Sequence, residues 1–336
     1  MFIVFFAYAC MASAFVTNKM LLSYLSPSLL VGLRMLAAGL ALIFFNSNSK
    51  RFTWGYIKKD LFHLTSIVLF TTSIPSVLKA YALKHMLTFK VSLIWSFDPF
   101  ITAFYAYLIW HERLNWNKVL GISIAFLGVL GTLIAQSPGE DALMISTVIS
   151  YPEIAAIIAM MLGRLGWMTV QYLLRKERYT PVEVNGITMT ASGVLTLTWV
   201  FFINPFIDAC FFSNSPSLAL FWQQICELVS TSFTQIRALS DWKAFGLLVY
   251  TIWIGNFIGY TMYARALKSY SATLVSLAGF SYPIIAAILA YFALGESITW
   301  QFALAAIVIF IGLLVFNFDQ LTVKKSKKVV EGGGGL

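Results

Sequence analysis

Charged residues are scarce in this 336-residue chain, where they make up 11% of the sequence and only 14 of them are acidic. In soluble domains roughly a quarter of the residues are charged, so this scarcity excludes an ordinary soluble fold. Hydrophobic residues instead make up 59%, and the mean hydropathy is +0.80. We therefore expect an all-α integral membrane protein that is embedded in the lipid bilayer.

Cysteine and histidine are also scarce, with three residues each. The cysteines have no metal-ligand spacing, and His63, His85 and His111 share no motif with an acid or a nucleophile. We therefore expect no metal site, no cofactor and no enzymatic activity. Cys210 and Cys226 lie in one polar segment, so they either stay free or form a disulfide if that segment faces an oxidising compartment.

The chain is basic, with a formal net charge of +9. A basic balance is compatible with nucleic-acid binding, but the Lys and Arg residues lie in short clusters between apolar segments and no recognition module is visible. We therefore expect no nucleic-acid partner. The clusters instead follow the positive-inside rule of membrane proteins.

Ten apolar segments have about the twenty residues that a helix needs to cross a hydrocarbon core of ~30 Å. The first lacks the charged start and the cleavage site of a signal peptide, so we expect it to be retained. We number the segments as spans one to ten and place them near residues 2–22, 28–45, 61–83, 89–109, 118–135, 150–174, 184–203, 243–266, 272–294 and 299–317.

Basic residues follow every even-numbered span, whereas the opposite side carries Glu140, Asp141 and the mostly acidic stretch Asn204–Asp241. The positive-inside rule therefore predicts a multi-pass protein of the cell (inner) membrane with both termini in the cytoplasm and Asn204–Asp241 outside. Residues 319–336 are basic and then rich in glycine, which predicts a disordered cytoplasmic tail.

The stretch from Ser92 to Trp116 recurs later in the chain. A weaker match, of Thr17 with Thr169, relates spans one and six. The sequence thus predicts an internal duplication, with five-helix repeats at residues 1–136 and 150–318. Adding 184 to the residue number gives identical pairs without a gap: Ala82 and Ala266, Val91 and Val275, Pro99 and Pro283, Tyr107 and Tyr291, Glu112 and Glu296, Trp116 and Trp300, and Gly128 and Gly312.

Five spans per repeat force the second copy to enter the membrane from the other side, so the repeats are predicted to be inverted. Carriers with inverted repeats hold their solute near the bilayer midplane and expose it to one side at a time. The pattern therefore indicates an alternating-access transporter of a small-molecule metabolite. A channel would need a repeated ring of one residue type, which Asp98 opposite Tyr282 does not give. A receptor or scaffold remains an alternative.

The repeated elements resemble a known family. Tyr81-Ala82-Leu83-Lys84 closes one span, Glu112-Arg113-Leu114 with Trp116 follows the next, and Gly295-Glu296-Ser297 with Trp300 repeats the latter. These elements resemble the EamA-type carriers of the drug/metabolite transporter superfamily, except that the segment 204–241 is longer. The resemblance implies ten helices and a central cavity lined by spans one, three, four, six, eight and nine. It also implies solutes that range over amino acids, nucleoside-like metabolites and drugs.

Four of the charged residues inside the spans are candidates for the site, because a charge at the bilayer centre costs at least ~2.5 kcal/mol and usually faces a cavity or a partner. Asp98 lies midway along span four, next to Pro99, which is expected to loosen the helix. Arg164 lies midway along span six. Both are predicted to bind solute, or alternatively to form a buried ion pair with each other. Lys79 is a further candidate, although snorkelling or a structural contact is the alternative for Lys79 and for Arg34, whose span the resemblance places outside the cavity.

Polar and aromatic residues form a stripe on span eight with spacings of three, four and three, which is one face of a helix. The face of span three that lies 184 residues earlier is also polar and includes Lys79. Trp95 on span four and Tyr282 on span nine add aromatic rings. We predict that these residues line the solute cavity, with core packing as the alternative for the stripe, which comprises Trp253, Asn256, Tyr260 and Tyr263.

An acid, a guanidinium and several rings suit a zwitterion that carries an aromatic or sulfonium-like cationic part. In this interpretation Arg164 binds a carboxylate, Asp98 neutralises the positive group, and the rings provide their faces. Among the carriers of the resembled family, those that exchange S-adenosylmethionine for S-adenosylhomocysteine match this chemistry best. An amino-acid or drug exporter and a nucleotide-sugar-type carrier are the alternatives. The coupling ion and the oligomeric state stay open.

Overall fold

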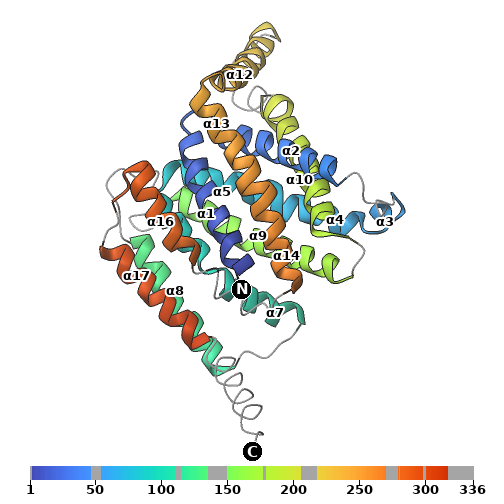
Figure 1. Ribbon diagram of the computed structural model, residues 1–336. Coiled ribbons are helices and arrows are strands. Elements are labelled where there is room, and N and C mark those ends of the chain that lie inside the picture. The colour runs from blue at the N-terminus through green and yellow to red at the C-terminus, as the bar shows by residue number, and fades with distance from the viewer. Residues whose placement is uncertain are drawn as a thin grey trace, which may run out of the picture.

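The regular structure of the protein is helical throughout the part that the computed structural model describes, which comprises residues 2–46, 54–110, 115–134, 150–176, 179–205, 218–269, 279, 281–297 and 300–316. The helices pack side by side around α1 and α9 (Figure 1). The bounds are α1 Phe2–Leu21, α2 Pro27–Phe45, α3 Trp54–Lys59, α4 Leu61–Ile67, α5 Ile74–His85, α6 Thr88–Trp95, α7 Asp98–Trp110, α8 Trp116–Ile134, α9 Tyr151–Arg175, α10 Pro181–Thr198, α12 Leu218–Ala238, α13 Trp242–Tyr250, α14 Thr261–Ser269, α16 Ser281–Leu294 and α17 Trp300–Phe316.

Six continuous helices of the described part are long and apolar enough to cross a membrane. The shorter apolar helices α16 and α17 coincide with parts of spans nine and ten. The protein is therefore a multi-pass membrane protein. The six are Ile3–Leu21, Pro27–Phe45, Leu61–His85, Tyr151–Arg175, Pro181–Ile203 and Trp242–Ser269, which match the predicted spans one, two, three, six, seven and eight.

Span four is broken in the middle. Helix α6 ends at Trp95 and α7 begins at Asp98, so the helix is interrupted just before Pro99. Proline has no backbone N–H and restricts the residue before it, which explains an interruption at this level. The break puts Asp98 at the first residue of a helix, where the helix dipole favours a negative charge.

Spans three and eight contain π-helical segments at equivalent positions. Segment η1 (Val68–Ser73) joins α4 to α5, and η3 (Thr251–Tyr260) joins α13 to α14. Adding 184 to the numbers of η1 gives positions within η3. Hydrogen bonds from residue i to i+5 widen the turn, so residues three and four apart no longer share one face as they do in an α-helix. A third segment, η2 (Trp199–Ile203), extends α10.

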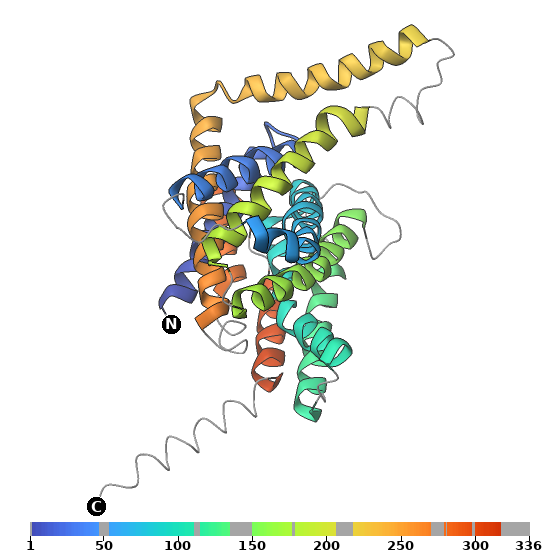
Figure 2. The same cartoon turned by 90° about the vertical axis from the view of Figure 1, so that its right-hand side faces the viewer.

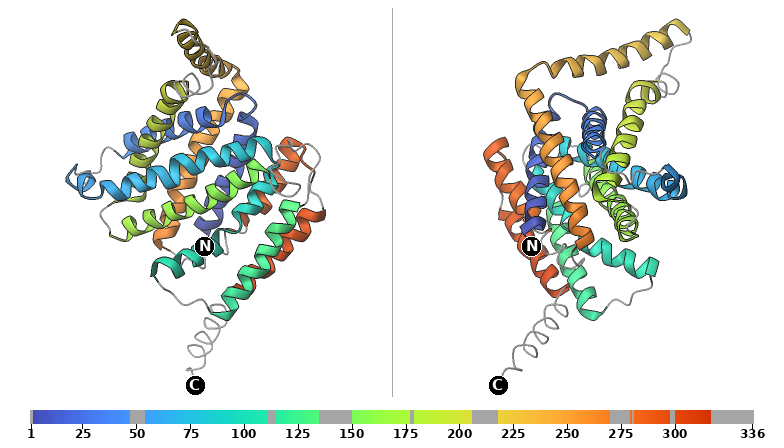
Figure 3. Two further views of the ribbon diagram at one scale, coloured as in Figure 1. Left: turned by 180° about the vertical axis from the view of Figure 1, so that it is seen from behind. Right: turned by 45° about the vertical axis from the view of Figure 1, so that its right-hand side comes forward.

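Glycines allow two pairs of helices to approach closely. A Cβ atom on Gly193 of α10 would lie 2.4 Å from the backbone N of Leu36 on α2. On α8, a Cβ at Gly121 would lie 2.6 Å from the backbone O of Gly312 on α17. Figure 3 shows α8 and α17 side by side along their whole length. Small residues at membrane helix interfaces favour such packing because little hydrophobic driving force acts between helices in lipid.

The segment 204–241 is not simply a loop, because it contains the 21-residue helix α12. This helix lies across one end of the bundle and extends beyond α10 (Figure 2). Gln235 holds it there by accepting a hydrogen bond of 2.9 Å from the backbone N of Ser26, and the rings of Phe233 and Phe201 pack 5.3 Å apart. Charge composition alone did not indicate this helix. The predicted tail, residues 319–336, and Cys210 lie outside the described residues.

Candidate functional site

A cavity of about 70 Å³ opens between α1, the break of span four, and α14. Asp98 lines it, and its Oδ2 lies 3.0 Å from the Nη1 of Arg164 on α9. The two side chains are 27% and 7% exposed, so the pair is largely removed from solvent. Nη1 of Arg164 also lies 3.5 Å from the hydroxyl of Tyr263. This conformation therefore contains the Asp98–Arg164 ion pair, which was the alternative to solute binding by the two residues.

Aromatic rings surround this ion pair. Tyr263 packs edge-on against Tyr8 at 5.7 Å and against Trp167 at 4.7 Å between ring centroids. Trp167 also contacts Tyr260, at 5.6 Å. Trp95 lines the same cavity. The sequence interpretation identified Trp95 and Tyr263 but not Tyr8 or Trp167, although both lie on spans that the family resemblance assigned to the cavity.

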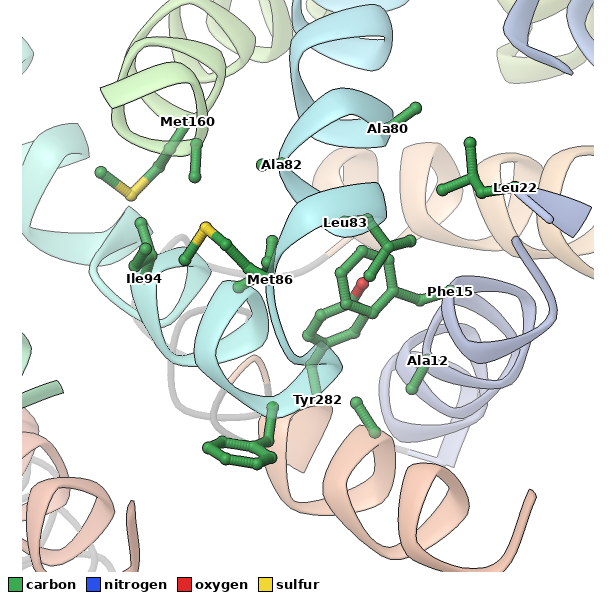
Figure 4. Close-up of a cluster of buried hydrophobic side chains, with 14 of the residues drawn as sticks. Ala12, Phe15, Leu22, Ala80, Ala82, Leu83, Met86, Ile94, Met160 and Tyr282 are labelled. Carbon is green, nitrogen blue, oxygen red and sulfur yellow. The ribbon is translucent and has the colours of Figure 1, made fainter. Parts of the chain in front are cut away.

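A second cavity, of about 40 Å³, adjoins the first, and Lys79 and Tyr282 line both. The Nζ of Lys79 lies 3.3 Å from the hydroxyl of Tyr282 and over the rings of Trp95 at 4.3 Å and Phe15 at 4.7 Å. The rings of Phe15 and Tyr282 also contact each other, at 5.7 Å, beside Leu83 (Figure 4). Lys79 is therefore directed into the protein by cation–π contacts and does not snorkel.

Arg34 also lines the second cavity, which differs from what the resemblance implied for its span. It is 8% exposed, so it does not reach an aqueous interface. Its Nε has no hydrogen-bond partner among the described residues, and neither has the Oδ1 of Asn18, which lines the same cavity. The sequence signal for this site was present, since a charge inside a membrane span usually faces a cavity or a partner.

The polar stripe of span eight is divided by its π-helical turns. Asn256 and Tyr260 line the second cavity and Tyr263 lines the first. Asn256 is 1% exposed and its Nδ2 donates to the backbone O of Arg34 at 3.4 Å. Trp253 does not join them: it is 39% exposed and packs against Phe257 at 5.1 Å, outside both cavities. The stripe assumed α-helical spacing, and the wider turn of η3 rotates Trp253 away.

Comparison with known proteins identifies the family. The EamA-like transporter family matches residues 1–134 and 213–318, which is more than two thirds of the chain. The chain belongs to this family. Family membership indicates that the protein is a membrane transporter rather than an enzyme.

Three curated relatives of this EamA-like transporter share one name. A protein of Chlamydia muridarum named "S-adenosylmethionine/S-adenosylhomocysteine transporter" is 25% identical, over 88% of this chain and 84% of its own. Its namesake from Chlamydia trachomatis serovar L2 is 24% identical, over 88% and 82%. A solved structure described as "Crystal structure of protein" has a TM-score of 0.54 and 14% identity, and the match covers 93% of this chain and 94% of its own. The latter likeness concerns the fold alone.

The repeated glutamate of this EamA-like transporter has a structural contact in its second copy. The carboxylate of Glu296 accepts hydrogen bonds of 2.8 Å from both the backbone N and the hydroxyl of Thr88. Thr88 is the first residue of α6, so Glu296 satisfies free N–H groups and places a negative charge at a helix N-terminus. The copy at Glu112 lies outside the described residues. Glu296 therefore ties the segment after α16 to the start of α6, and it lines neither cavity.

Three further charges inside the helices have structural partners that the sequence interpretation missed. The Nζ of Lys90 on α6 lies 2.7 Å from Glu153 on α9, and both side chains are 4% exposed. The Nζ of Lys19 donates to the backbone O of Leu83 at 2.6 Å, near the end of α5. Cations at helix C-termini offset unpaired carbonyl groups. Among the described residues, no group of three or more His, Cys, Asp or Glu is placed to hold a metal ion.

Proposed function

We propose that this protein is an alternating-access carrier built from two inverted five-helix repeats, at residues 1–136 and 150–318. In this proposal ten helices cross the cell (inner) membrane, both termini are cytoplasmic, and the segment containing α12 is external. Each cavity has room for roughly three to five water molecules, so neither admits a whole metabolite. The halves must therefore separate on one side to admit solute, as rocking of one repeat against the other would allow.

Contacts related by the duplication support a two-fold relation between the repeats, and the odd number of spans per repeat makes the arrangement an inverted one. Lys79 and Tyr282, which contact each other, correspond to Tyr263 and Asp98 when 184 is added or subtracted. The latter two both bond to Arg164. The helix pairs agree as well, since α2 packs on α10 and α8 on α17, which are spans two with seven and five with ten. A two-fold relation between the repeats maps each of these pairs onto itself.

We infer that the solute is a zwitterion and that S-adenosylmethionine is exchanged for S-adenosylhomocysteine. The observation that carries this inference is the mixed charge of the adjoining cavities. Asp98 offers the one carboxylate among the described residues that line them, while Lys79 and Arg34 offer cations and Trp95, Trp167 and Tyr263 offer rings. A sulfonium or an ammonium suits the carboxylate and the ring faces, and an adenine suits stacking. The names of the chlamydial relatives agree with this choice.

Counterflow in proteoliposomes tests the function. Vesicles loaded with unlabelled S-adenosylhomocysteine should accumulate labelled S-adenosylmethionine transiently, because only a carrier couples the two fluxes. A competition panel of zwitterionic, cationic and phosphorylated solutes then reports the class of substrate. Competition by nucleotide sugars or simple drugs, without competition by S-adenosylhomocysteine, would reject the proposed substrate pair and retain a carrier. Equal leakage of all solutes would reject the carrier.

A further inference from the structure

The guanidinium of Arg34 is a buried cation without a carboxylate. It is 8% exposed and faces the 40 Å³ cavity, and its Nε lacks a hydrogen-bond partner among the described residues. Of the five N–H donors of this guanidinium, the Nε–H is thus buried without an acceptor, which is costly. An anion that enters the cavity would give this group a hydrogen-bond acceptor and neutralise its buried charge.

The surroundings of Arg34 favour an anion further. Among the described residues that line this cavity, none is an Asp or a Glu, while Lys79 contributes a second positive charge. The remaining polar groups are neutral and include Ser76, Asn18 and the hydroxyl of Tyr260. The volume corresponds to roughly three water molecules, which is the scale of one carboxylate group.

Arg164, which the sequence favoured for the carboxylate of the solute, is already engaged. Its Nη1 lies 3.0 Å from Asp98 and 3.5 Å from Tyr263. A solute carboxylate at Arg164 would have to lie beside Asp98, and the two negative charges would repel each other. Arg34 has no such competitor.

We propose that Arg34, assisted by Lys79, binds the carboxylate of the transported zwitterion. The proposal rests on the transport function proposed above and specifies its geometry. Because Lys79 and Tyr282 line both cavities, a solute with its carboxylate at Arg34 extends past these two residues toward Asp98 and the rings of Trp95 and Tyr263. The cationic part of the solute then lies toward Asp98 and the rings, and the anionic part beside Arg34.

A comparison of two solutes isolates this contact. S-adenosylmethionine and its decarboxylated form share the sulfonium and the adenine and differ in the carboxylate. The wild type should transport the carboxylated solute more efficiently, as judged by kcat/KM in counterflow. Arg34→Gln should reduce that preference at least about tenfold, which is the scale of one hydrogen bond to a charged group. Arg34→Lys, which keeps the charge but not the fork, should retain part of the preference.

The matched control removes the other guanidinium. The double variant Asp98→Asn/Arg164→Gln takes away the ion pair without stranding a charge, and it should lower transport of both solutes while the preference persists. Wild-type preference in a folded Arg34→Gln protein, or loss of preference only in the double variant, would overturn the proposal.

A binding measurement keeps the subsite testable if the wild type transports neither solute, a result that would reject the proposed function. L-methionine carries the carboxylate and L-methioninol lacks it. Methionine should raise the Tm of the detergent-solubilised wild type more than methioninol does, and Arg34→Gln should abolish the difference. An equal effect of the two probes on the wild type would reject the subsite.

Discussion

At the scale of single residues, the ion pair of Asp98 and Arg164 lets two charged side chains stay largely buried inside apolar spans. With the carboxylate 27% and the guanidinium 7% exposed, each ion is stable mainly because the other is near. Asp98→Asn should therefore strand Arg164 and lower the free energy of unfolding by ~3 to 5 kcal/mol, and a second change, Arg164→Gln, should restore much of the loss. Thermal unfolding of the single and double variants in detergent measures both effects.

Two other outcomes would assign Asp98 a different partner. An Asp98→Asn protein with wild-type stability that has lost transport of zwitterions and cations would indicate that the solute neutralises Asp98. A variant that still exchanges solute for solute but no longer responds to a pH gradient would indicate that Asp98 carries a coupling proton. Full activity in every assay would remove Asp98 from the site.

Tyr260 and Trp253 form a matched pair on one helix. Tyr260 lines the cavity of Arg34, whereas Trp253 packs outside both cavities. Tyr260→Ala should weaken the apparent affinity for a zwitterionic solute by roughly 0.5 to 2 kcal/mol, because a hydrogen bond from the Tyr260 hydroxyl to the solute carboxylate is lost. Trp253→Ala should leave the affinity unchanged. Competition for uptake measures the apparent affinity of both variants. A loss of affinity in Trp253→Ala but not in Tyr260→Ala would contradict the division of the stripe by the π-helical turns.

Sequence reasoning identified most of these side chains because a charge or a polar stripe in an apolar span is unusual. Arg34 was not predicted to line the cavity because the family resemblance assigns whole spans to the cavity and leaves out span two. An assignment of whole spans says nothing about a single turn of another span that faces inward. Lys90 and Glu153 were missed for a different reason. Each lies near the end of a predicted span, where a charged side chain can reach the membrane interface, and only the tertiary structure brings the two together.

At the scale of elements, hydropathy predicted which segments form membrane-spanning helices but not where those helices are π-helical or broken. Pro99 indicated the break of span four, since the missing N–H is visible in the sequence. The π-helical segments η1 and η3 have no such marker, and they explain why the stripe was divided. Helix α12 was missed because polarity and acidic charge indicated a loop, although its sequence has the apolar periodicity of an amphipathic helix.

The α2–α10 contact yields a prediction at this scale. A Cβ on Gly193 would meet the backbone of Leu36 at 2.4 Å, so Gly193→Ala should force the helices apart and cost about 1 to 3 kcal/mol of stability. Gly246→Ala on α13 is the matched control, because a Cβ there meets nothing within 4 Å. The control should be neutral or slightly stabilising, since alanine favours helix. Equal Tm values for the two variants would contradict the close packing of α2 and α10.

At the scale of the whole molecule, the duplication makes a prediction about sidedness. Lys59 ends α3, just before span three, and Lys243, 184 residues later, lies in the first turn of α13, where span eight begins. Both side chains are exposed, so a cysteine at either position should react readily. Inverted repeats require these equivalent positions to lie on opposite faces of the membrane, whereas parallel repeats require the same face.

Labelling in a background without the three native cysteines separates these cases. A membrane-impermeant maleimide should label the Lys243→Cys variant in intact cells and the Lys59→Cys variant only after permeabilisation, because the basic cluster that includes Lys58 and Lys59 marks the cytoplasmic side. Opposite labelling with the sides exchanged would keep the inverted repeat and reverse the orientation. Labelling of both variants from one side would remove the inverted repeat, and with it the reason to expect that one pair of cavities opens alternately to the two faces.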